Sequence, residues 1–450
     1  MSAPSREMLF GWGRANYARS LVYRPSGPDE AVEAVRDARR RGLTVAHRGA
    51  GQSYGDAALN QGGAVLQTTG LDRILRYDPE GGRIRAEAGV TVDRLWRHVV
   101  ADGWWPPVVP GTSRPTLGGC LAMNVHGKNH MGAGSFAEHV RWVAVLGPDG
   151  EVEEHTRDGG GLDGVAGAQG TSGTILALEI ELKRVNSGYL GVEARTAASL
   201  DDTLQGLDTL AEAHEHAVAW VDCFSAGDAL GRAELHAASD LDREHPRADE
   251  GLSVEEQAPG PRALGLLPRD RLASVLRLAV CDPGIRALNR AKYFHARAAH
   301  PSSHLEPRAS FHFLLDYVPG WRRAYGPAGL VQYQFFVPEG RAGEVFRRAL
   351  RLQHERDVVS YLGVLKRHRE DPFPAGYSVD GYSLALDFPV GRRLTDLMGL
   401  LREYDRLQEW AGGRIYAAKD SVSRLGAVPR GGAEVYSSNL LRRWRRTASA

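Results

Sequence analysis

Lysine is rare in this sequence, which uses arginine for nearly all of its cations. Only five of the 56 basic residues are lysine, namely Lys128, Lys183, Lys292, Lys366 and Lys419. Three of them stand in distinctive short contexts: HGKNH around residue 128, YLGVLKRH around residue 366 and YAAKDS around residue 419. Lysine is a compact charge whose pKa shifts readily on burial, whereas arginine stays protonated. These three lysines are therefore candidates for holding or releasing a proton, and chance survival in an arginine-biased composition is the alternative for each.

The stretch RGAGQSYGDAALNQGG, residues 48–63, is a glycine-rich loop behind a short strand. Glycine permits positive φ and close backbone approach, so successive N–H groups of such a loop can hold an anion. A dinucleotide-binding Rossmann loop would open a helix and be followed by an acid about 20 residues on, and neither condition is met here. The segment favours a phosphate site without a helix, and an ordinary glycine-rich turn is the alternative.

A second glycine-rich segment covers residues 108–136. It contains TLGGCLAM, which can form a short helix whose N-terminus faces a phosphate, and two such loops can grip one long diphosphate ligand. His126 and His130 have the H-x-x-x-H spacing of some zinc sites. Gly127 between them disfavours a helix, however, and no glutamate stands beside either histidine. We therefore predict no metal site.

Composition narrows the function classes. The 450 residues include 56 basic and 55 acidic side chains, for a formal net charge of +1, so no overall field attracts nucleic acid or an anionic bilayer. No stretch approaches the roughly 18 apolar residues of a membrane span, and the first residues contain no apolar signal-like run; we expect a cytoplasmic protein. Cys120, Cys223 and Cys281 lack metal or disulfide spacing and are predicted to be small buried hydrophobes.

The hydrophobic patterns predict an α+β arrangement of short elements. Capped amphipathic patterns predict helices over 26–42, 91–103, 340–357 and 394–413. Residues 140–156 read as a hairpin. Alternating or β-branched runs predict strands over 43–48, 64–70, 83–90, 173–185, 359–368, 382–390 and 414–421.

The elements predict a first domain over 10–185 and a boundary in NSGYLG, with a second domain after it. Between predicted strands of the second domain, residues 236–264 are polar and unpatterned. We interpret them as a mobile loop that gates the pocket.

Five segments carry a resemblance to a known family. They resemble, in order, segments of the decaprenylphosphoryl-β-D-ribose oxidases, the flavoprotein half of a sugar 2'-epimerase, within the vanillyl-alcohol oxidase and p-cresol methylhydroxylase superfamily. The resemblance covers about residues 10–424 and implies FAD and a two-subdomain FAD-binding domain over 10–185. It also implies an α+β substrate domain with an antiparallel sheet over 186–404, and a C-terminal segment over 405–450 that returns to the FAD-binding domain. The segments are RGAGQSYGDAALNQGG, PGTSRPTLGGCLAMNVHGKNHMGAGSFAEHV, WRRAYGPAGLVQYQFFVP, GYSLALDFPVG and GGRIYAAKDS.

The resemblance also implies site residues. Those expected to line FAD are Arg48, Gly49, Ala50, Gly51, Gln52, Ser53, Tyr54, Gly55, Gly111, Thr112, Thr116, Leu117, Gly118, Gly119, His126, Gly127, Lys128, Asn129, Ile175 and Tyr416. Those expected to face the substrate are Lys128, Tyr325, Gln332, Gln334, Lys366, Ser383 and Ala385. The catalytic candidates are Lys419, His126 and Tyr54.

The chain also departs from the family pattern. Gln52 stands where several superfamily members have a histidine bonded to the flavin, so we expect FAD to be held without a covalent bond. Ser383 and Ala385 replace an asparagine and a cysteine of the family pocket, and the segment after residue 421 is shorter. These departures lie on the substrate side.

Hydride transfer from an alcohol carbon to flavin N5 requires that the hydroxyl proton leave as well. Lys419, Tyr54 or His126 would take it, and a cation at Lys419 would also stabilise reduced flavin. Gln332 and Gln334 alternate on one strand face and can orient sugar hydroxyls, with a satisfied core amide pair as the alternative.

We therefore predict an FAD-dependent oxidoreductase that converts a sugar hydroxyl to a carbonyl. The preferred substrate is a soluble sugar such as an aminoglycoside or nucleoside intermediate, and decaprenylphosphoryl ribose, on the route to cell-wall arabinan precursors, is the alternative. A separate NAD(P)H-dependent reductase is a possible partner. A non-catalytic flavin- or sugar-binding protein is the alternative of another class.

Overall fold

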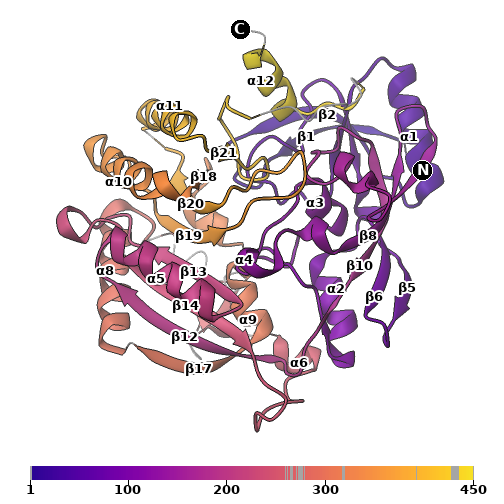
Figure 1. The fold of residues 1–450 in the computed structure, drawn as a ribbon. Helices are drawn as coiled ribbons and strands as arrows, with labels where there is room; N and C mark the ends of the chain where they lie inside the picture. Colours follow the sequence, from indigo (N-terminus) through magenta and orange to yellow (C-terminus); the bar gives the residue numbers. More distant parts are fainter. Residues whose placement is uncertain are drawn as a thin grey trace.

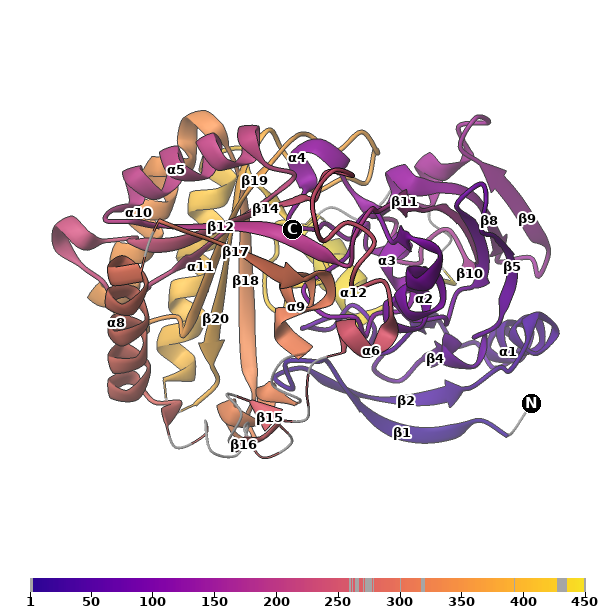
Figure 2. The same ribbon diagram turned by 90° about the horizontal axis from the view of Figure 1, so that it is seen from below.

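The computed structural model of the chain describes residues 3–258, 279–299, 301–316, 320–391, 393–426 and 435–448, together with a few residues between 260 and 277. The chain forms two lobes that lie side by side (Figure 1). The first part of the chain builds one lobe and the middle part builds the other, while the last helix lies on the first lobe again (Figures 1 and 2). Among the described residues, no helix is both long and apolar enough to cross a membrane.

A sheet of four strands begins the first lobe. Its order is β1-β2-β4-β3, with β1 antiparallel to β2 and with β2 and β3 both parallel to β4. Helix α1 (Pro28–Arg40) makes the crossover from β2 to β3, with proline and acids in its first turn and arginines in its last, as its sequence predicts. The four strands are β1 (Ser5–Phe10), β2 (Tyr17–Tyr23), β3 (Val45–Arg48) and β4 (Ala64–Gln67).

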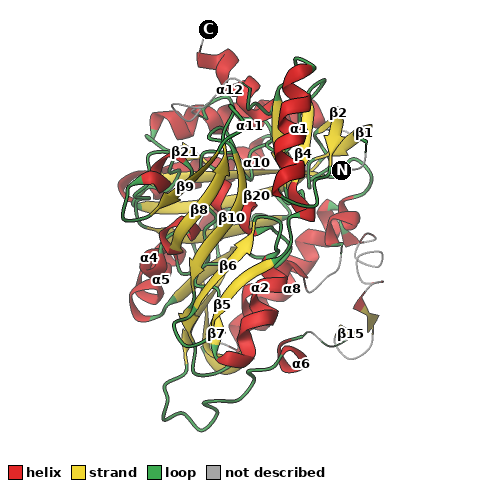
Figure 3. Ribbon diagram, turned by 90° about the vertical axis from the view of Figure 1, so that its right-hand side faces the viewer, coloured by secondary structure: helices red, strands yellow, loops and turns green. Residues whose placement is uncertain are grey.

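A five-stranded antiparallel sheet completes this lobe, in the order β5-β6-β10-β8-β9 (Figure 3). Helices α2 (Val92–Val99) and α3 (Leu117–Ala122) share one hydrophobic core with it. The strands are β5 (Ile74–Asp78), β6 (Arg83–Glu87), β8 (Val140–Leu146), β9 (Val152–Thr156) and β10 (Thr174–Glu181). Shorter elements are β7 (Trp104–Trp105), α4 (His130–Ala133) and β11 (Lys183–Arg184).

The second lobe is built on an eight-stranded antiparallel sheet in the order β17-β12-β14-β13-β19-β20-β18-β21. Four helices cover the face that is turned away from the first lobe (Figure 2). The strands are β12 (Tyr189–Ala197), β13 (His216–Val221), β14 (Ala233–Asp240), β17 (Ser302–Pro307), β18 (Leu330–Pro338), β19 (Leu362–His368), β20 (Gly381–Pro389) and β21 (Arg414–Ile415). The helices are α5 (Leu200–Ala213), α8 (Asp282–Ala299), α10 (Glu339–Glu355) and α11 (Leu394–Trp410). Smaller elements are α6 (Val254–Gln257), β15 (Arg262–Ala263), β16 (Leu267–Pro268) and α9 (Arg308–His312).

Alternation along β18 gives this sheet two different faces. Its odd-numbered residues, including Tyr333 and Phe335, lie in the hydrophobic core under the helices. Side chains alternate along a strand, so Gln332 and Gln334 point to the opposite face, toward the first lobe. Phe336 on the same face packs against Tyr377 and Tyr416, so this face combines an aromatic cluster with buried amide side chains.

The prediction of an unpatterned loop over 236–264 is wrong in its first part. Residues to Asp240 belong to β14, whose last residues, HAASD, do not alternate and so gave a weak strand signal. The chain beyond is anchored: Ser187 Oγ donates to the Arg247 carbonyl at 2.9 Å, and the Gln257 amide donates to the Gly188 carbonyl at 2.8 Å. Several residues from 259 onward lie outside the described residues, and gating stays a prediction.

Three smaller expectations also change. The boundary placed after residue 404 falls inside α11, and β21 pairs with β18, so we propose that the returning segment begins after residue 415. Strand 414–421 is confined to β21, because residues 416–419 form a turn. Cys120 and Cys223 are buried as expected, whereas Cys281 is exposed.

Candidate active site

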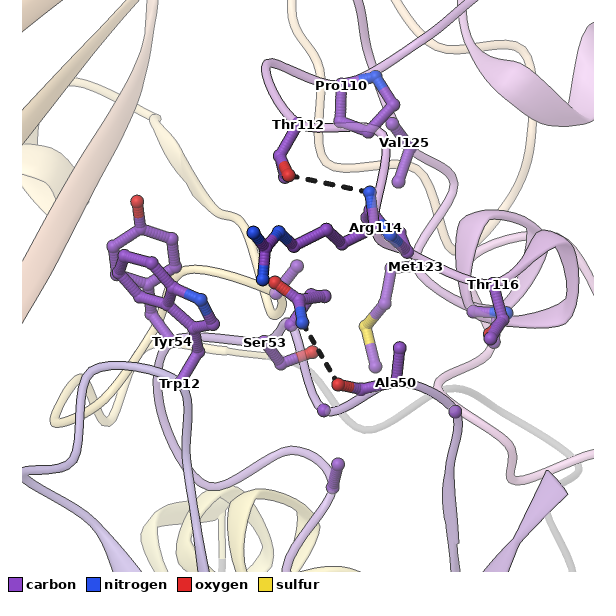
Figure 4. Close-up of a pocket in the computed structure, with 18 of the residues that line it drawn as sticks. Trp12, Ala50, Ser53, Tyr54, Pro110, Thr112, Arg114, Thr116, Met123 and Val125 are labelled. Carbon is purple, nitrogen blue, oxygen red and sulfur yellow. Dashed lines mark hydrogen bonds between the residues drawn. The ribbon is translucent and has the colours of Figure 1, made fainter. Parts of the chain in front are cut away.

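The two glycine-rich segments line one cavity of about 450 Å³, to which both lobes contribute. Figure 4 shows Ala50 and Ser53 on one side of it and Thr112 and Thr116 on the other. The predicted residues in its wall are Gly49, Ala50, Gly51, Gln52, Ser53, Tyr54, Gly111, Thr112, Thr116, Gly118, Gly119, Ile175, Tyr416 and Lys419.

Close backbone packing explains the glycines of this wall. A Cβ atom at Gly49 would lie 2.1 Å from the Thr116 hydroxyl oxygen, and one at Gly118 would lie 2.7 Å from the Ala88 Cβ. Gly51 has a φ of +67°, a left-handed conformation that favours glycine. The result is a cradle of backbone amides and small side chains, which fits the diphosphate of a dinucleotide cofactor.

One end of the cavity is aromatic and carries Lys419. Trp12 and Tyr54 lie with ring centroids 4.6 Å apart, as Figure 4 shows, and Tyr416 is also in the wall. The Lys419 ammonium lies 3.9 Å from the centroid of the Tyr54 ring. A flat aromatic ligand group at this end would therefore meet aromatic rings and one cation together.

The burial of Lys419 determines the pKa of its ammonium group. Burial lowers its pKa from 10.5 to about 8, and the carboxylate of Asp387 works against that decrease. The Tyr54 hydroxyl has a pKa raised well above 10, because of burial and then because of Asp387. Lys419 is thus the group of this pair that can change its protonation near neutral pH.

Asp387 on β20 is a buried carboxylate that the sequence analysis did not select. It stands opposite Gln332 in the β18–β20 ladder, and the Gln332 amide donates to its Oδ1. Burial raises its pKa from 3.8 to about 6, while the Gln332 hydrogen bond and Lys419 oppose the shift. Asp387 therefore couples the sheet face to the Lys419 end of the cavity.

His126 lies next to Tyr416, with ring centroids 5.3 Å apart. Burial, followed by Lys366 and His130, holds its pKa well below 6.5. A neutral imidazole can accept a hydrogen bond from the Gln334 amide, whose nitrogen is 3.2 Å from His126 Nε2. His126 is thus set to orient Gln334.

Lys366 on β19 adds a second deep ammonium to the sheet face. Its Nζ donates to the Gly127 carbonyl at 3.1 Å. Burial, with smaller contributions from Lys128 and Lys419, lowers its pKa to about 7. A group of this kind can gain or lose a proton as a polar ligand arrives.

Other predicted residues make contacts with protein groups. The Lys128 ammonium lies 4.1 Å from the Phe311 ring centroid, with a pKa lowered by burial to about 8, and the Asn129 amide donates to the Pro107 carbonyl at 2.9 Å. Ser383 contacts His368 Nε2 at 2.8 Å, so its hydroxyl is already engaged. The roles predicted for these residues toward ligands stay predictions.

The remaining predicted positions are not among the residues that line the cavity. Arg48 donates to the Phe10 carbonyl at 3.0 Å, and Tyr325 packs on Trp321 with ring centroids 5.3 Å apart. Gly55 approaches the Asp420 carbonyl so closely that a Cβ would lie 2.0 Å from it. Leu117 is fully buried in α3, and Ala385 stands opposite Gln334 in the ladder.

Sequence reasoning missed several wall residues. Trp12 could have been found from its flanking glycines, since a Cβ at Gly11 or Gly13 would lie within 2.4 Å of a backbone oxygen of another segment. Asp387 could also have been found, because alternation along β20 places it on the same face as Ser383 and Ala385. Arg114, whose side chain reaches into the cavity in Figure 4, and Arg322 gave no signal in a chain rich in arginine.

Fold and cavity together define a class, that of two-lobed proteins in which a glycine-loop lobe holds a dinucleotide cofactor against a polar sheet face. Comparison with known sequences agrees. A family model described as an FAD binding domain matches residues 20–156. Decaprenylphosphoryl-beta-D-ribose oxidase of Mycolicibacterium smegmatis is 32% identical over 428 residues, which is 92% of this chain and 88% of that protein.

Two further relatives extend the comparison. An uncharacterized protein of Streptomyces coelicolor is 32% identical over 74% of this chain and 90% of its own length. D-2-hydroxyglutarate dehydrogenase of Escherichia coli is 31% identical over 136 residues, which is 30% of this chain and 13% of that protein. The chain belongs to the family of FAD-dependent oxidoreductases that includes decaprenylphosphoryl-β-D-ribose oxidase, and FAD is its cofactor.

Proposed function

We propose that this oxidoreductase oxidises a secondary hydroxyl of a sugar to a carbonyl. The observation that carries the proposal is the meeting of Lys419 and Tyr54 at one end of the cavity with a sheet face that presents Gln332, Asp387 and Lys366. Several hydrogen-bonding side chains in a row match a ligand with several hydroxyl groups.

The residues of this chain divide the work in the proposal. FAD, when bound, supplies the acceptor for the hydride. The neutral amine of Lys419 takes the hydroxyl proton at Nζ, and the resulting ammonium stabilises negative charge nearby. Gln332, held by Asp387, and Gln334, held by His126, fix the sugar so that one carbon is exposed to oxidation.

The glycine cradle and Gln52 support FAD held without a covalent bond, because a glutamine amide is not a nucleophile. Acid precipitation of the purified protein should release all of the yellow colour into the supernatant. Colour that stays in the pellet would show a covalent link elsewhere and contradict this part of the proposal.

A soluble sugar is the first substrate class, because Ser383 is engaged by His368 and Ala385 leaves room beside Gln334, so that the pocket differs from the family pattern. Identity to the mycobacterial oxidase over most of both chains favours a second candidate, a lipid-linked phosphoryl ribose. In either case the carbonyl product could be reduced by a separate NAD(P)H-dependent enzyme to complete an epimerisation.

Anaerobic bleaching of the flavin tests the proposal. The holoenzyme should lose its absorbance near 450 nm, a wavelength on the order expected for the oxidised cofactor, when the right sugar is added. A set of free aminoglycosides and nucleosides forms one arm, and phosphoryl ribose on a short prenyl chain forms the other. Bleaching by D-2-hydroxy acids alone would exclude a sugar substrate.

A further inference from the structure

Helix α12 (Asn439–Ala448) places one arginine between two buried carboxylates. Arg443 Nη2 lies 2.7 Å from Asp56 Oδ1, and its Nη1 lies 2.9 Å from Asp420 Oδ2. The Arg443 side chain is 19% exposed, that of Asp56 is 10% exposed and that of Asp420 is 3% exposed. The three charged groups are therefore largely shielded from solvent. Removing one partner of such a buried ion pair leaves an uncompensated charge and is strongly destabilising.

The two carboxylates belong to the two segments that carry the proposed catalytic pair. Asp56 follows Tyr54 by two residues in the first glycine loop, and Asp420 directly follows Lys419. The segments are already side by side, because the Tyr54 backbone N–H donates to the Ala418 carbonyl at 2.9 Å. Arg443 contacts a carboxylate of each segment and does not line the cavity.

Asp420 is held on more than one side. Its Oδ1 accepts from the backbone N–H groups of Val422 at 2.9 Å and Ser423 at 2.8 Å, which fixes the turn after Lys419. The Trp444 indole N–H donates to its Oδ2 at 3.3 Å. The backbone at Lys419 is thus connected to helix α12 through one rigid turn.

Arginine suits this position better than lysine. A guanidinium is a planar fork that can bond two carboxylates in fixed directions, whereas an ammonium is a point charge on a flexible stem. Burial raises the pKa of Asp56, and Arg443 counteracts that increase. Arg443 therefore partly offsets the cost of burying the Asp56 carboxylate.

We propose that Arg443 is a positioning residue for the reaction: by bridging Asp56 and Asp420 it sets the place of the Lys419 ammonium over the Tyr54 ring. Arg443 is not among the residues that line the cavity. This inference rests on the proposed function in assigning the proton transfer to Lys419, but the geometry it describes exists without any substrate.

Arg443→Lys is the main test, with Arg442→Lys as the matched control. Arg442 is the preceding residue of the same helix, and it bonds Asn60 at 2.6 Å rather than the Lys419 segment. The midpoint potential of the bound flavin, measured with a chemical reductant, reports the cation near the ring without any sugar. FAD content and Tm are measured beside it.

Arg443→Lys should keep its FAD and its Tm close to those of Arg442→Lys. Its flavin potential should move to more negative values, in the direction that Lys419→Met moves it, and flavin reduction by substrate should slow by about 10-fold with KM little changed. In the apo-protein, the Tyr54 amide should exchange its hydrogen faster. A flavin potential equal to that of Arg442→Lys would overturn the proposal and leave Arg443 a structural ion pair.

Asp56→Asn keeps the test decisive if Arg443→Lys does not fold. It removes one side of the bridge and leaves Arg443 on Asp420, and the flavin potential should again become more negative. An unchanged potential with FAD bound would refute the positioning role. If no sugar reduces the wild-type flavin, the proposed function fails, while the potentials still decide whether Arg443 positions Lys419.

Discussion

In the first lobe the cavity wall is made of backbone and small side chains, whereas the sheet face of the second lobe is made of ionisable and amide side chains. Residues 49–53 contribute two glycines, an alanine and a serine beside Gln52. The sheet face presents Gln332, Lys366 and Asp387, two of which have pKa values moved toward neutrality by burial. We call the glycine-lined side of the cavity the first wall and this sheet face the second wall. The first wall depends on shape and the second on charge, so substitutions in the two walls should have different effects.

Lys419 lies where the two walls meet, and its removal should have the largest effect. Lys419→Ala should retain most of the FAD but slow flavin reduction by at least about 100-fold, because one preorganised electrostatic partner is lost. Lys419→Arg should fail nearly as badly, since arginine does not release a proton. Rapid mixing with the true substrate measures both rates.

Two results would revise this view. If Lys419→Arg reduces its flavin as fast as wild type, Lys419 is a fixed charge and the proton leaves through His126 or Tyr54. If Lys419→Ala does so too, the catalytic end of the cavity lies elsewhere.

A change of shape in the first wall should affect cofactor affinity rather than rate. Gly49→Val places branched carbon against the Thr116 hydroxyl and should weaken FAD binding by at least about 10-fold, with about 1–3 kcal/mol lost from the free energy of unfolding. Gly132→Val is the control, because a Cβ there has no atom within 4 Å. FAD titration of the apo-proteins gives the affinities, and equal affinities would contradict the close-packing argument.

A change of charge in the second wall should affect the pH profile. Asp387 raises the pKa of Lys419, so Asp387→Asn should lower that pKa below about 8. Because the neutral amine is the proposed base, the rate of flavin reduction should increase with pH, and this increase should occur at lower pH in Asp387→Asn than in wild type. The maximal rate should fall by about 10-fold, because Gln332 loses its charged acceptor. Asp380→Asn, an exposed acid before β20, is the control, and a shift toward higher pH in Asp387→Asn would reverse the assignment.

The smallest effect is expected at Lys366, which lies farther along the sheet face. Lys366→Met keeps the length of the side chain, and KM for the substrate should rise by about 3- to 10-fold while kcat changes little. Lys292→Met on α8 serves as the control. A fall in kcat with constant KM would instead place Lys366 in the chemical step.

Local signals predicted much of the first lobe. Helix α1, helix α3 and the β8–β9 hairpin are determined by helix-terminal residues, glycines and a turn that lie within a few residues of each element. Such signals can be read from the sequence alone. The second wall depends on pairing between distant strands. Gln332 meets Asp387 only because β18 and β20 pair in one register, and neither residue alone signals its partner.

The wrong predictions have the same physical origin. The end of β14 reads HAASD, with two adjacent alanines and no clear alternation, so its pattern resembled a loop. Its strand state is decided by β12 and β13 on either side. The turn at 416–419 follows a sequence with strand propensity, but close packing on the first glycine loop overrides it. The rarity of lysine in the sequence identified Lys419 as a candidate, but it did not predict where in the fold Lys419 lies.

The bridge made by Arg443 has a consequence for the synthesis of the protein. Asp56 and Arg443 are 387 residues apart in the chain, and ribosomes add roughly 5–20 residues per second. Arg443 is therefore synthesised tens of seconds after the first glycine loop. A growing chain that binds FAD during that interval would hold the cofactor before the bridge that positions Lys419 exists, so efficient oxidation would wait until Arg443 has been added.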